Sequence, residues 1–422
     1  MAASACRPLA PATTRARRAA VVPALAVALA AGLAPAVLLS ASAPGFEARF
    51  VLPPQDEHVH SSSIVELPGG DLFAVYYRGS GERRADDVRL EGARLARGTA
   101  AWSSPFPVAD SPGFPDCNPV AFVDARERLL VVWPAVLDNR WESALLRYRA
   151  APVAGWTAGP PPWNDGGVVL LRPDNLKEKA EPFARAALAT LPPGRDRDGL
   201  SLLVERLSDK LLNRLGWMPR THALRLPGGR LLLPLYSDTY DIGLVAISDD
   251  DGATWRASDP IVSLGGVQPS LVRRRDGTVV AWMRDNGPPP QRVIVAQSRD
   301  DGVTWTEGMD SDVPNPGSSV EVVALRDGSW LMVLNDTESG RARLSAWVSD
   351  DEGRSWPRRR ALEDTPGGSY SYPSVLQAAD GLVHVTYSHV DPVPGGGKRP
   401  EAIKHVVFDA GWVGAAGEGG PR

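Results

Sequence analysis

The sequence predicts an all-β chain folded as a six-bladed β-propeller, with one helical insertion between blades two and three. Three observations predict this fold: a turn motif starting at residues 248, 298 and 349, six strand–turn–strand segments, and a tryptophan after each segment. A repeat of about 50 residues is typical of propeller blades, and each blade is a four-stranded sheet.

The turn motif has the form S-x-D-x-G-x-[ST]-W and occupies residues 248–255, 298–305 and 349–356. Each copy follows an alternating apolar run such as residues 292–297, so we expect it in the turn after a strand. Asp and Ser or Thr side chains satisfy the amides of such a turn, and Gly supplies the permissive backbone. The Trp is expected to pack between neighbouring sheets.

Six segments consist of an apolar strand, a turn and a second apolar strand. They are residues 62–77, 119–134, 221–236, 269–284, 320–335 and 373–388, the second with a degenerate turn at 124–127. The tryptophans that follow them in order are Trp102, Trp156, Trp255, Trp305, Trp356 and Trp412. Residues 46–415 are therefore expected to form the propeller, with residues 47–52 as an outer strand that closes the last blade.

The gap between the second and third segments is about twice the repeat. Residues 174–216 in this gap predict two helices, the second with Leu200, Val204, Leu207, Leu211 and Leu215 at helical spacing. We expect this insertion to pack on the rim of the propeller; a lid or a dimer contact is the alternative.

Residues 1–43 have the layout of a secretory signal peptide. Four arginines precede an apolar run from Ala19 to Leu39, and a small-residue cleavage site follows at 41–43. The alternative is an uncleaved membrane anchor. The expected location is secreted or periplasmic, and after cleavage no stable membrane insertion is expected.

Removing the four arginines takes the formal net charge of the chain from −4 to about −8. This charge disfavours nucleic acid and anionic membrane surfaces as partners. Cys6 lies in the signal segment, so Cys117 would be the single cysteine of the mature chain and no intrachain disulfide is expected.

The innermost strands of a propeller converge on one axis, so residues at equivalent positions form a shared ring. Nine residues before the last turn position stand polar side chains in all six segments: Ser61, Asn118, Arg220, Gln268, Ser319 and Tyr372. Polar residues often mark strand starts, but six together favour a polar site at the mouth of the channel.

The turn motifs resemble the Asp-boxes of the sialidase (neuraminidase) superfamily, and residues 58–412 resemble bacterial sialidase-like BNR-repeat proteins. The resemblance implies that the boxes are structural turns remote from the active site. It also implies a glycosidase that holds a substrate carboxylate with three arginines, attacks with a tyrosine activated by a glutamate, and uses an aspartate as acid/base.

Three residues match that catalytic pattern. Tyr372 stands where the resemblance places the nucleophile, Arg284 matches the second arginine and Arg341 matches the third. Arg343 is the alternative to Arg341. Guanidinium groups suit this role because they bind carboxylates in a bidentate manner.

Other positions depart from the pattern. His60 stands where the first arginine is expected, Gln268 replaces the activating glutamate, and Ser388 replaces the glutamate that orients the first arginine. Since glutamine cannot act as a base, we expect Glu321 either to compensate or to serve as a structural carboxylate. His60 would carry a charge only at lower pH.

The blade-one loop offers Glu82, Asp86 and Asp87 as the acid/base, and position favours Asp87. His60 and His222 are the other candidates for proton transfer. No cluster of His, Cys and Asp has metal-ligand spacing, so no metal or cofactor is expected.

The sequence therefore predicts an exported sialidase-like exo-glycosidase that cleaves a terminal acidic sugar from a glycan. Tyr372, Asp87 and Glu321 are the candidate catalytic residues; the candidate substrate-binding residues are Arg284, Arg341, His60, Gln268, Arg220 and Asn118. Two alternatives stay open. The same scaffold could act on a uronic or deoxy sugar, or it could bind glycans without catalysis.

Overall fold

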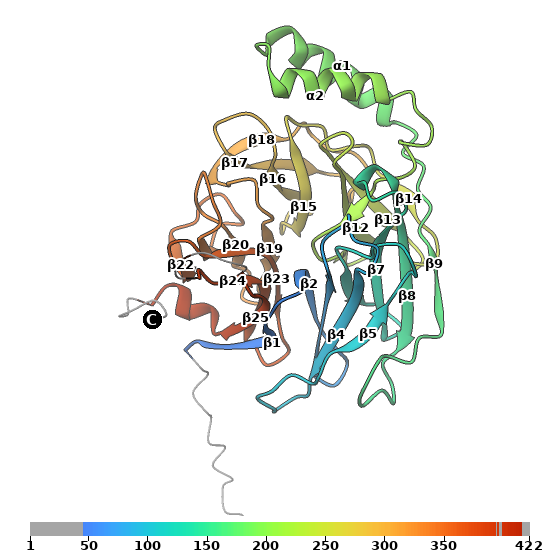
Figure 1. Ribbon diagram of the computed structural model, residues 1–422. Helices are drawn as coiled ribbons and strands as arrows, with labels where there is room; N and C mark the ends of the chain where they lie inside the picture. Colours follow the sequence, from blue (N-terminus) through green and yellow to red (C-terminus); the bar gives the residue numbers. More distant parts are fainter. Residues whose placement is uncertain (1–44, 394, 396–398, 416–422) are drawn as a thin grey trace, which may run out of the picture. The chain divides into compact units, whose positions relative to one another are not determined.

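The computed structural model describes residues 45–393, 395 and 399–415. Their strands form six antiparallel sheets arranged in chain order around a central axis (Figure 1). The predicted six-bladed β-propeller is confirmed. The proposed signal peptide lies outside the described residues, in which no helix is long and apolar enough to cross a membrane.

In each blade the strands are given below from the innermost to the outermost. Blade one contains β2 (His58–Glu66), β3 (Leu72–Gly79), β4 (Arg89–Leu95) and β5 (Phe106–Ala109). Blade two contains β6 (Val120–Val123), β7 (Arg128–Val136), β8 (Ala144–Pro152) and β9 (Asp165–Val168). Blade three contains β10 (Met218–Pro219), β11 (Leu224–Arg225), β12 (Leu231–Ser237), β13 (Ile242–Ser248) and β14 (Arg256–Ala257).

The remaining blades follow the same order. Blade four contains β15 (Gly266–Arg273), β16 (Val279–Asp285), β17 (Arg292–Ser298) and β18 (Met309–Pro314). Blade five contains β19 (Glu321–Ala324), β20 (Trp330–Leu334), β21 (Arg343–Ser349) and β22 (Arg358–Asp364). Blade six contains β23 (Ser369–Gln377), β24 (Val383–Val390), β25 (Glu401–Phe408) and β1 (Glu47–Gln55). Short 3₁₀ helices cover Trp141–Ser143 and Ala410–Val413.

Strand β1 closes the ring, as the sequence predicts. It pairs antiparallel with β25, so the first strand of the propeller is the outermost strand of the last blade. Figure 1 shows blue β1 beside the red strands of blade six. This pairing joins the first strand of the propeller to its last blade by backbone hydrogen bonds, so the ring is closed.

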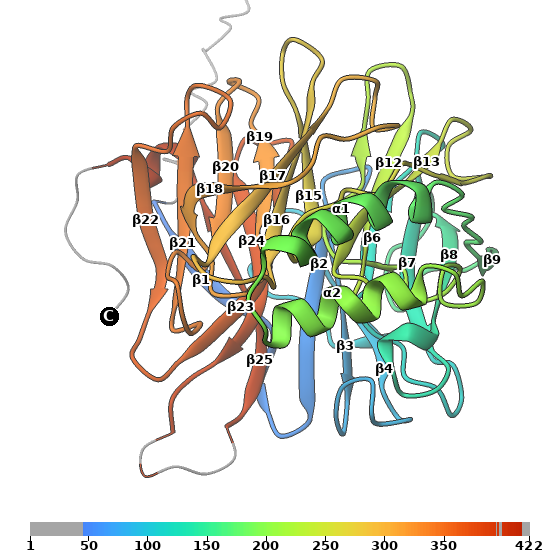
Figure 2. The same ribbon diagram turned by 90° about the horizontal axis from the view of Figure 1, so that it is seen from above.

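The insertion forms helices α1 (Leu176–Thr190) and α2 (Arg195–Arg206), between the second and third sheets. The two helices run side by side beyond the sheets of blades three and four (Figures 1 and 2). Leu176, Ala180 and Leu203 pack them onto the core shared by blades two and three. The second helix is shorter than the leucine spacing predicts. It ends at Arg206, and Leu211 is 65% exposed because the chain turns there instead of continuing the buried stripe.

The Asp-box turns lie between the third and fourth strands of their blades. In the box of blade four, Asp300 accepts hydrogen bonds from the Ser298 hydroxyl at 2.8 Å and from the Thr304 amide at 2.9 Å. Third strands run in the same direction as first strands, so these turns lie at the end of the propeller opposite the starts of the inner strands. The boxes are therefore remote from the predicted polar ring.

Candidate functional site

A repeated backbone distortion shapes the mouth of the channel. Ser61, Asn118, Gln268 and Tyr372, four of the six predicted ring residues, have φ between 41° and 58°. The pairing of the inner strand with the second strand shifts in register around three of them, between His60 and Ser63 for example. A left-handed non-glycine residue costs roughly 1–2 kcal/mol, and such bulges re-aim side chains. The strain is therefore stored where the ring faces the channel.

Tyr372 is the centre of the site. Its hydroxyl accepts a hydrogen bond from Nη1 of Arg284 at 3.0 Å and one from Nε2 of Gln268 at 3.4 Å. The guanidinium of Arg341 lies 5.5 Å from the centroid of the tyrosine ring. The structure thus brings Arg284 and Gln268 of blade four and Arg341 of blade five together on the phenol of blade six.

A third arginine supports the tyrosine from within the protein. Arg220 is 2% exposed, and its guanidinium lies 4.8 Å from the centroid of the Tyr372 ring. Its Nη2 donates to the Pro373 carbonyl at 2.9 Å and its Nη1 donates to the Ser62 carbonyl at 3.4 Å. Arg220 is therefore held by backbone acceptors beneath the ring and acts on Tyr372 by its charge.

These cations change the acidity of the tyrosine. Burial alone would raise the pKa of Tyr372, but Arg284 and Arg341, with the hydrogen bond from Gln268, lower it below the ordinary value of 10.0. A phenol with a lowered pKa is more readily converted to the phenolate, which is the stronger nucleophile. Glu82 opposes this effect.

His60 lies against the same ring, with 4.2 Å between the imidazole and Tyr372 ring centroids. Burial, followed by the charges of His58, Arg341, Arg220 and Arg284, lowers the pKa of His60 well below 6.5. The lower pH at which His60 is expected to gain a charge is therefore well below 6.5. Since three arginines surround a half-buried imidazole, the site keeps it neutral. Ser388, at the position of the missing orienting glutamate, accepts a hydrogen bond from the Ser61 amide at 3.0 Å.

Gln268 and Asn118 line the floor of the mouth. Both are buried, and Asn118 Nδ2 lies 3.4 Å from the Tyr236 hydroxyl. The carbonyl oxygens of both amides are buried without a partner among the described residues. These free acceptors, close to Tyr372, are suited to a ligand hydroxyl or to water.

Glu321 lies below this floor, with both carboxylate oxygens occupied. Oε1 accepts from His222 Nδ1 at 2.8 Å and from the His222 amide at 2.9 Å, and Oε2 accepts from the Val375 amide at 2.7 Å. His222 Nε2 lies 2.5 Å from the Ile64 carbonyl, so both imidazole nitrogens face acceptors. The geometry thus describes a buried imidazolium–carboxylate pair, and Glu321 faces His222 instead of the Tyr372 hydroxyl.

The three acidic residues of the blade-one loop differ in their surroundings. Asp87, the residue that position favours, accepts from the Ser80 hydroxyl at 2.9 Å and from the Ser80 amide at 3.1 Å. Asp86 accepts from Asn139 at 2.8 Å. Glu82 accepts from the Tyr77 hydroxyl at 3.2 Å and pairs with Arg83 at 2.8 Å. Of the three, Glu82 is the one whose charge raises the pKa of Tyr372.

One further carboxyl borders the site. Asp238 follows β12 directly and makes no hydrogen bond or ion pair with any described residue. Asp238 is itself exposed, yet the protein crowded around it, followed by the charges of Asp241 and Glu82, raises its pKa to about 6 against the opposing charges of Arg284 and Arg83. Sequence reasoning did not select Asp238.

A sequence signal existed for two of the residues that were missed. Tyr77, Tyr236 and Arg284 each end one of the 16-residue segments, so they share a register at the channel mouth. The resemblance marks Arg284 alone, whereas the shared segment end also marks Tyr77 and Tyr236. Asp238 has no such repeat because the loops at the mouth differ in every blade.

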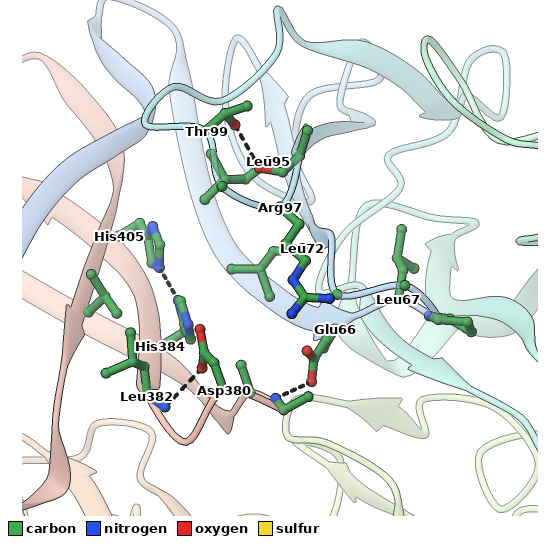
Figure 3. A pocket seen from close by; sticks show the side chains of 18 of the residues that line it. Glu66, Leu67, Leu72, Leu95, Arg97, Thr99, Asp380, Leu382, His384 and His405 are labelled. Carbon is green, nitrogen blue, oxygen red and sulfur yellow. Dashed lines mark hydrogen bonds between the residues drawn. The ribbon is translucent and has the colours of Figure 1, made fainter. Parts of the chain in front are cut away.

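A cavity of 560 Å³ lies at the opposite end of the propeller, between blades one and six (Figure 3). It is lined by turn residues such as Gly70 and Asp380 and by the hydrogen-bonded pair His384 and His405, whose ring nitrogens are 3.0 Å apart. None of the ring residues lines it. Among the described residues, no group of three or more His, Cys, Asp and Glu side chains could hold a metal ion.

The fold and the site together define a class of protein: a β-propeller with an arginine-flanked tyrosine at its channel mouth. Comparison with known proteins agrees with this class of protein. Residues 206–385 match the BNR repeat-like domain family. A sialidase from Clostridium perfringens is 32% identical over 128 residues, which is 26% of this chain and 32% of that protein. An anhydrosialidase from Macrobdella decora is 26% identical over 183 residues, covering 39% of this chain and 24% of that protein.

Solved structures share the fold across most of the chain. A protein of unknown function from Dyadobacter fermentans has a TM-score of 0.62 at 17% identity, covering 86% of this chain and 99% of that one. A leech intramolecular trans-sialidase with bound 2,7-anhydro-Neu5Ac has a TM-score of 0.62 at 14% identity, covering 85% and 69%. The chain is a sialidase-like BNR-repeat propeller, distantly homologous to bacterial and leech sialidases. Its matches span about a third or less of the two sialidase sequences.

Proposed function

We propose that this protein is an exported exo-glycosidase that cleaves a terminal acidic sugar from a glycan. The observation that carries the proposal is the Tyr372 hydroxyl, bonded to Arg284 and flanked by Arg341 and Arg220. Arginines that lower the pKa of a phenol also attract a carboxylate, so one arrangement serves both nucleophile and substrate.

In the proposed reaction, Tyr372 first gives its phenolic proton to solvent. The phenolate oxygen then forms a bond to the anomeric carbon while the bond from that carbon to the leaving oxygen breaks. The nucleophile is a phenol and not a carboxylate, which limits its repulsion of an anionic sugar. Water then attacks the same carbon and releases the tyrosine. Gln268 contributes a hydrogen bond to the phenol and cannot accept its proton, so the arginines carry the activation.

We assign the acid/base to Glu82. Its Oε1 bonds the Tyr77 hydroxyl at the channel mouth, and its charge reaches both Tyr372 and Arg341, although its Oε2 pairs with Arg83. The oxygens of Asp87 are bonded only to Ser80 within their own loop. Glu82 would give its proton to the leaving oxygen in the first step and remove one from the attacking water in the second.

The substrate carboxylate would lie against Arg284 and Arg341, which reach solvent, while Arg220 is buried beneath the tyrosine. The leech structure with 2,7-anhydro-Neu5Ac supports an acidic sugar of the sialic acid type. Because the accessible arginines are the two residues Arg284 and Arg341, and His60 is neutral, a smaller uronic or deoxy acid also fits this pair of arginines. Residues 1–43 would direct export, and sequencing the amino terminus of the secreted protein checks the cleavage near residue 43.

The deciding experiment replaces Tyr372 with Phe, which removes the hydroxyl with little change in volume. Turnover of a panel of aryl glycosides, including a sialoside, is expected to fall by orders of magnitude while circular dichroism is unchanged. Tyr148→Phe on β8 of blade two is the matched control. Wild-type turnover in Tyr372→Phe contradicts the assigned nucleophile.

Two observations favour one alternative, a glycan-binding propeller without catalysis. The side-chain carbonyl oxygens of Gln268 and Asn118 have no partner among the described residues, and position 268 lacks a base. Measurable binding of an acidic sugar by the wild-type protein, with no turnover of any glycoside in the panel, identifies that function.

A further inference from the structure

A chain of hydrogen bonds leads from Glu82 across blade one to blade six. The Tyr77 hydroxyl lies 3.2 Å from Glu82 Oε1 and 3.3 Å from His58 Nε2. Nδ1 of the same imidazole lies 2.9 Å from Glu401 Oε2, which also accepts from the Val59 amide at 3.2 Å. Glu82 is therefore linked through a phenol and an imidazole to a second carboxylate.

The pairing of β2 with β3 places these rings on one face of blade one. His58 and His60 are two residues apart on β2, so their side chains share a face, and Tyr77 of β3 is the partner of His60. The ring centroids of His58 and Tyr77 are 5.5 Å apart. Glu401 is the first residue of β25 in the last blade. The chain of bonds therefore crosses from the first blade of the propeller to the last.

Two partners account for both nitrogens of the His58 imidazole. Among the described residues, the titratable side chains in contact with it are Tyr77, Glu401 and His60, whose ring centroid lies 5.9 Å away. The site keeps His60 neutral. Glu57, which precedes His58 in the sequence, pairs with arginines of β3 and β4. A charge on His58 is therefore balanced by Glu401.

Two arrangements of protons satisfy every group in this chain of bonds. When Glu82 is ionised, it accepts from the Tyr77 hydroxyl, whose oxygen accepts from Nε2 of a protonated His58. When His58 is neutral, the Tyr77 hydroxyl donates to Nε2, and a protonated Glu82 donates to the Tyr77 oxygen. Oε2 of Glu82 pairs with Arg83 at 2.8 Å and takes no part. The two arrangements differ by one proton, which lies on His58 in the first and on Glu82 in the second.

Tyr77 remains a phenol in both arrangements. Burial, followed by the charge of Glu82, raises the pKa of Tyr77 well above 10.0. The hydroxyl therefore receives one proton as it gives up another, and it is not itself the source of a proton.

We propose that His58 holds the proton that Glu82 gives to the leaving oxygen, and that Tyr77 carries it between them. The inference rests on the proposed function and assigns the source of its proton. The Nε2 proton of His58 moves to the Tyr77 oxygen while the Tyr77 hydroxyl proton moves to Glu82, which protonates the leaving oxygen. When Glu82 takes a proton from the attacking water, both transfers run in reverse and the imidazole regains its proton. His58, Tyr77 and Glu401 act through Glu82 and are positioning residues.

Such a source extends the pH range over which a carboxyl group acts as an acid. In water a carboxyl ordinarily loses its proton near about pH 4.3, and an imidazole near about pH 6.5. A carboxylate that draws its proton from an imidazole can therefore protonate a leaving group at a pH about two units higher. His58 and Glu401 both reach solvent, so water can supply the first proton.

The test compares two substrates of the acidic sugar that the glycoside panel identifies: its nitrophenyl glycoside, and a disaccharide whose leaving oxygen needs a proton. The ratio of kcat/KM for the disaccharide to that for the nitrophenyl glycoside is measured between about pH 4 and pH 8. This ratio cancels the ionisation of Tyr372, which both substrates require. In His58→Gln, whose amide can still donate to Tyr77, the ratio is expected to fall about two pH units lower than in wild type.

Tyr77→Phe is expected to shift the fall of the ratio as far as His58→Gln does, and the double variant is expected to add nothing, because both break one path. Glu401→Gln removes the counter-charge and is expected to give a smaller shift in the same direction. Tyr76→Phe is the matched control, since this tyrosine of β3 is also buried and its hydroxyl has no partner among the described residues. Variants that slow both substrates alike, with the fall at its wild-type pH, overturn the inference and leave the proposed function standing.

NMR titration of the His58 imidazole separates the two proposals, because it needs no turnover. Glu82→Gln is expected to lower the pH at which this imidazole titrates, and to lower it less in the Tyr77→Phe background, where the path is broken. Equal shifts in both backgrounds overturn the path. Unequal shifts in a protein that cleaves no glycoside leave the shared proton standing and overturn the proposed function.

Discussion

At the scale of single residues, charge surrounding one phenol defines the site. Tyr372 is held in a left-handed conformation with φ of 58°, and three arginines from three blades converge on it. Burying a guanidinium group costs free energy, so the charge of each of these arginines must be compensated. Arg220 is compensated by backbone carbonyls, whereas Arg284 and Arg341 keep contact with solvent, as groups that bind an anion require.

Glu82 can be tested through the leaving group. Glu82→Gln is expected to lower turnover of a glycan substrate by about 10²–10⁴, because its leaving oxygen needs a proton. An aryl glycoside with an acidic phenol as leaving group is expected to lose much less. Asp87→Asn in the same loop is the control. Equal losses for both substrates, or a larger loss in Asp87→Asn, contradict the role of Glu82.

At the scale of elements, a buried ion pair joins the inner segments of blades from across the ring. Glu321 on β19 binds His222 of blade three and the Val375 amide of β23. His222 in turn faces the Ile64 carbonyl of β2. Four blades thus meet at one ion pair below the floor of the site, and this pair fixes how their inner strands lie relative to Tyr372.

Removing that carboxylate is expected to destabilise the fold in a pH-dependent way. Burial alone would lower the pKa of His222, but the charge of Glu321 and its hydrogen bonds to His222 raise it. The stabilisation that comes from protonated His222 is therefore complete below pH 6.5 and is lost as pH rises. Burial alone would raise the pKa of Glu321, but His222 lowers it. The stabilisation that comes from ionised Glu321 is therefore complete above pH 4.5 and is lost as pH falls. Glu321→Gln should therefore cost most between pH 4.5 and 6.5, about 3–5 kcal/mol.

Urea unfolding at pH 5.5 and pH 8 measures this prediction, with the exposed substitution Glu205→Gln as control. The difference in free energy of unfolding between wild type and Glu321→Gln is expected to shrink at pH 8. A difference that is the same at both pH values would show that His222 is not charged in the folded protein.

The Asp-boxes offer a contrasting prediction. Asp300→Ala removes an acceptor from three donors in its turn, including the Thr304 hydroxyl at 2.6 Å, and is expected to cost about 1–2 kcal/mol. Because the turn lies at the end opposite the site, turnover per folded molecule is expected to stay at the wild-type level. Thermal unfolding and activity of Asp300→Ala, compared with exposed Glu307→Ala, check both statements.

At the scale of the whole molecule, the ring is closed by strand pairing and not by covalent bonds. β1 pairs with β25, and Cys117, the free cysteine of the described residues, is buried. Closure therefore depends on backbone hydrogen bonds and on packing between adjacent blades.

Reductant is accordingly expected to leave the melting temperature of the protein unchanged. Burial raises the pKa of the Cys117 thiol well above its ordinary value, so a thiol reagent should label it only as the propeller unfolds. Melting curves with and without reductant, and labelling across a urea titration, measure the two effects. A melting temperature several degrees lower in reductant indicates a disulfide.

The number of blades, the closing strand and the position of Tyr372 and Arg284 can be read from the amino-acid sequence, because these features depend on short repeats at fixed register. A period of about 50 residues repeats the same turn and the same inner-strand position, so each element can be located without knowing its neighbours. The helices follow instead from helical leucine spacing within a gap of about twice the repeat, although α2 ends at Arg206, where the chain turns before the leucine pattern is complete.

Which side chains meet at the channel mouth is determined by the tertiary structure alone. Glu321 shares a strand face with the ring, but its oxygens are occupied by His222; Asp87 has the expected position, but Glu82 is the loop carboxylate that affects Tyr372. Asp238 lies in the loop after β12, which has no counterpart of the same sequence in the other blades. Charge, burial and hydrogen bonding in the site depend on residues from different blades, and that convergence is a property of the closed ring.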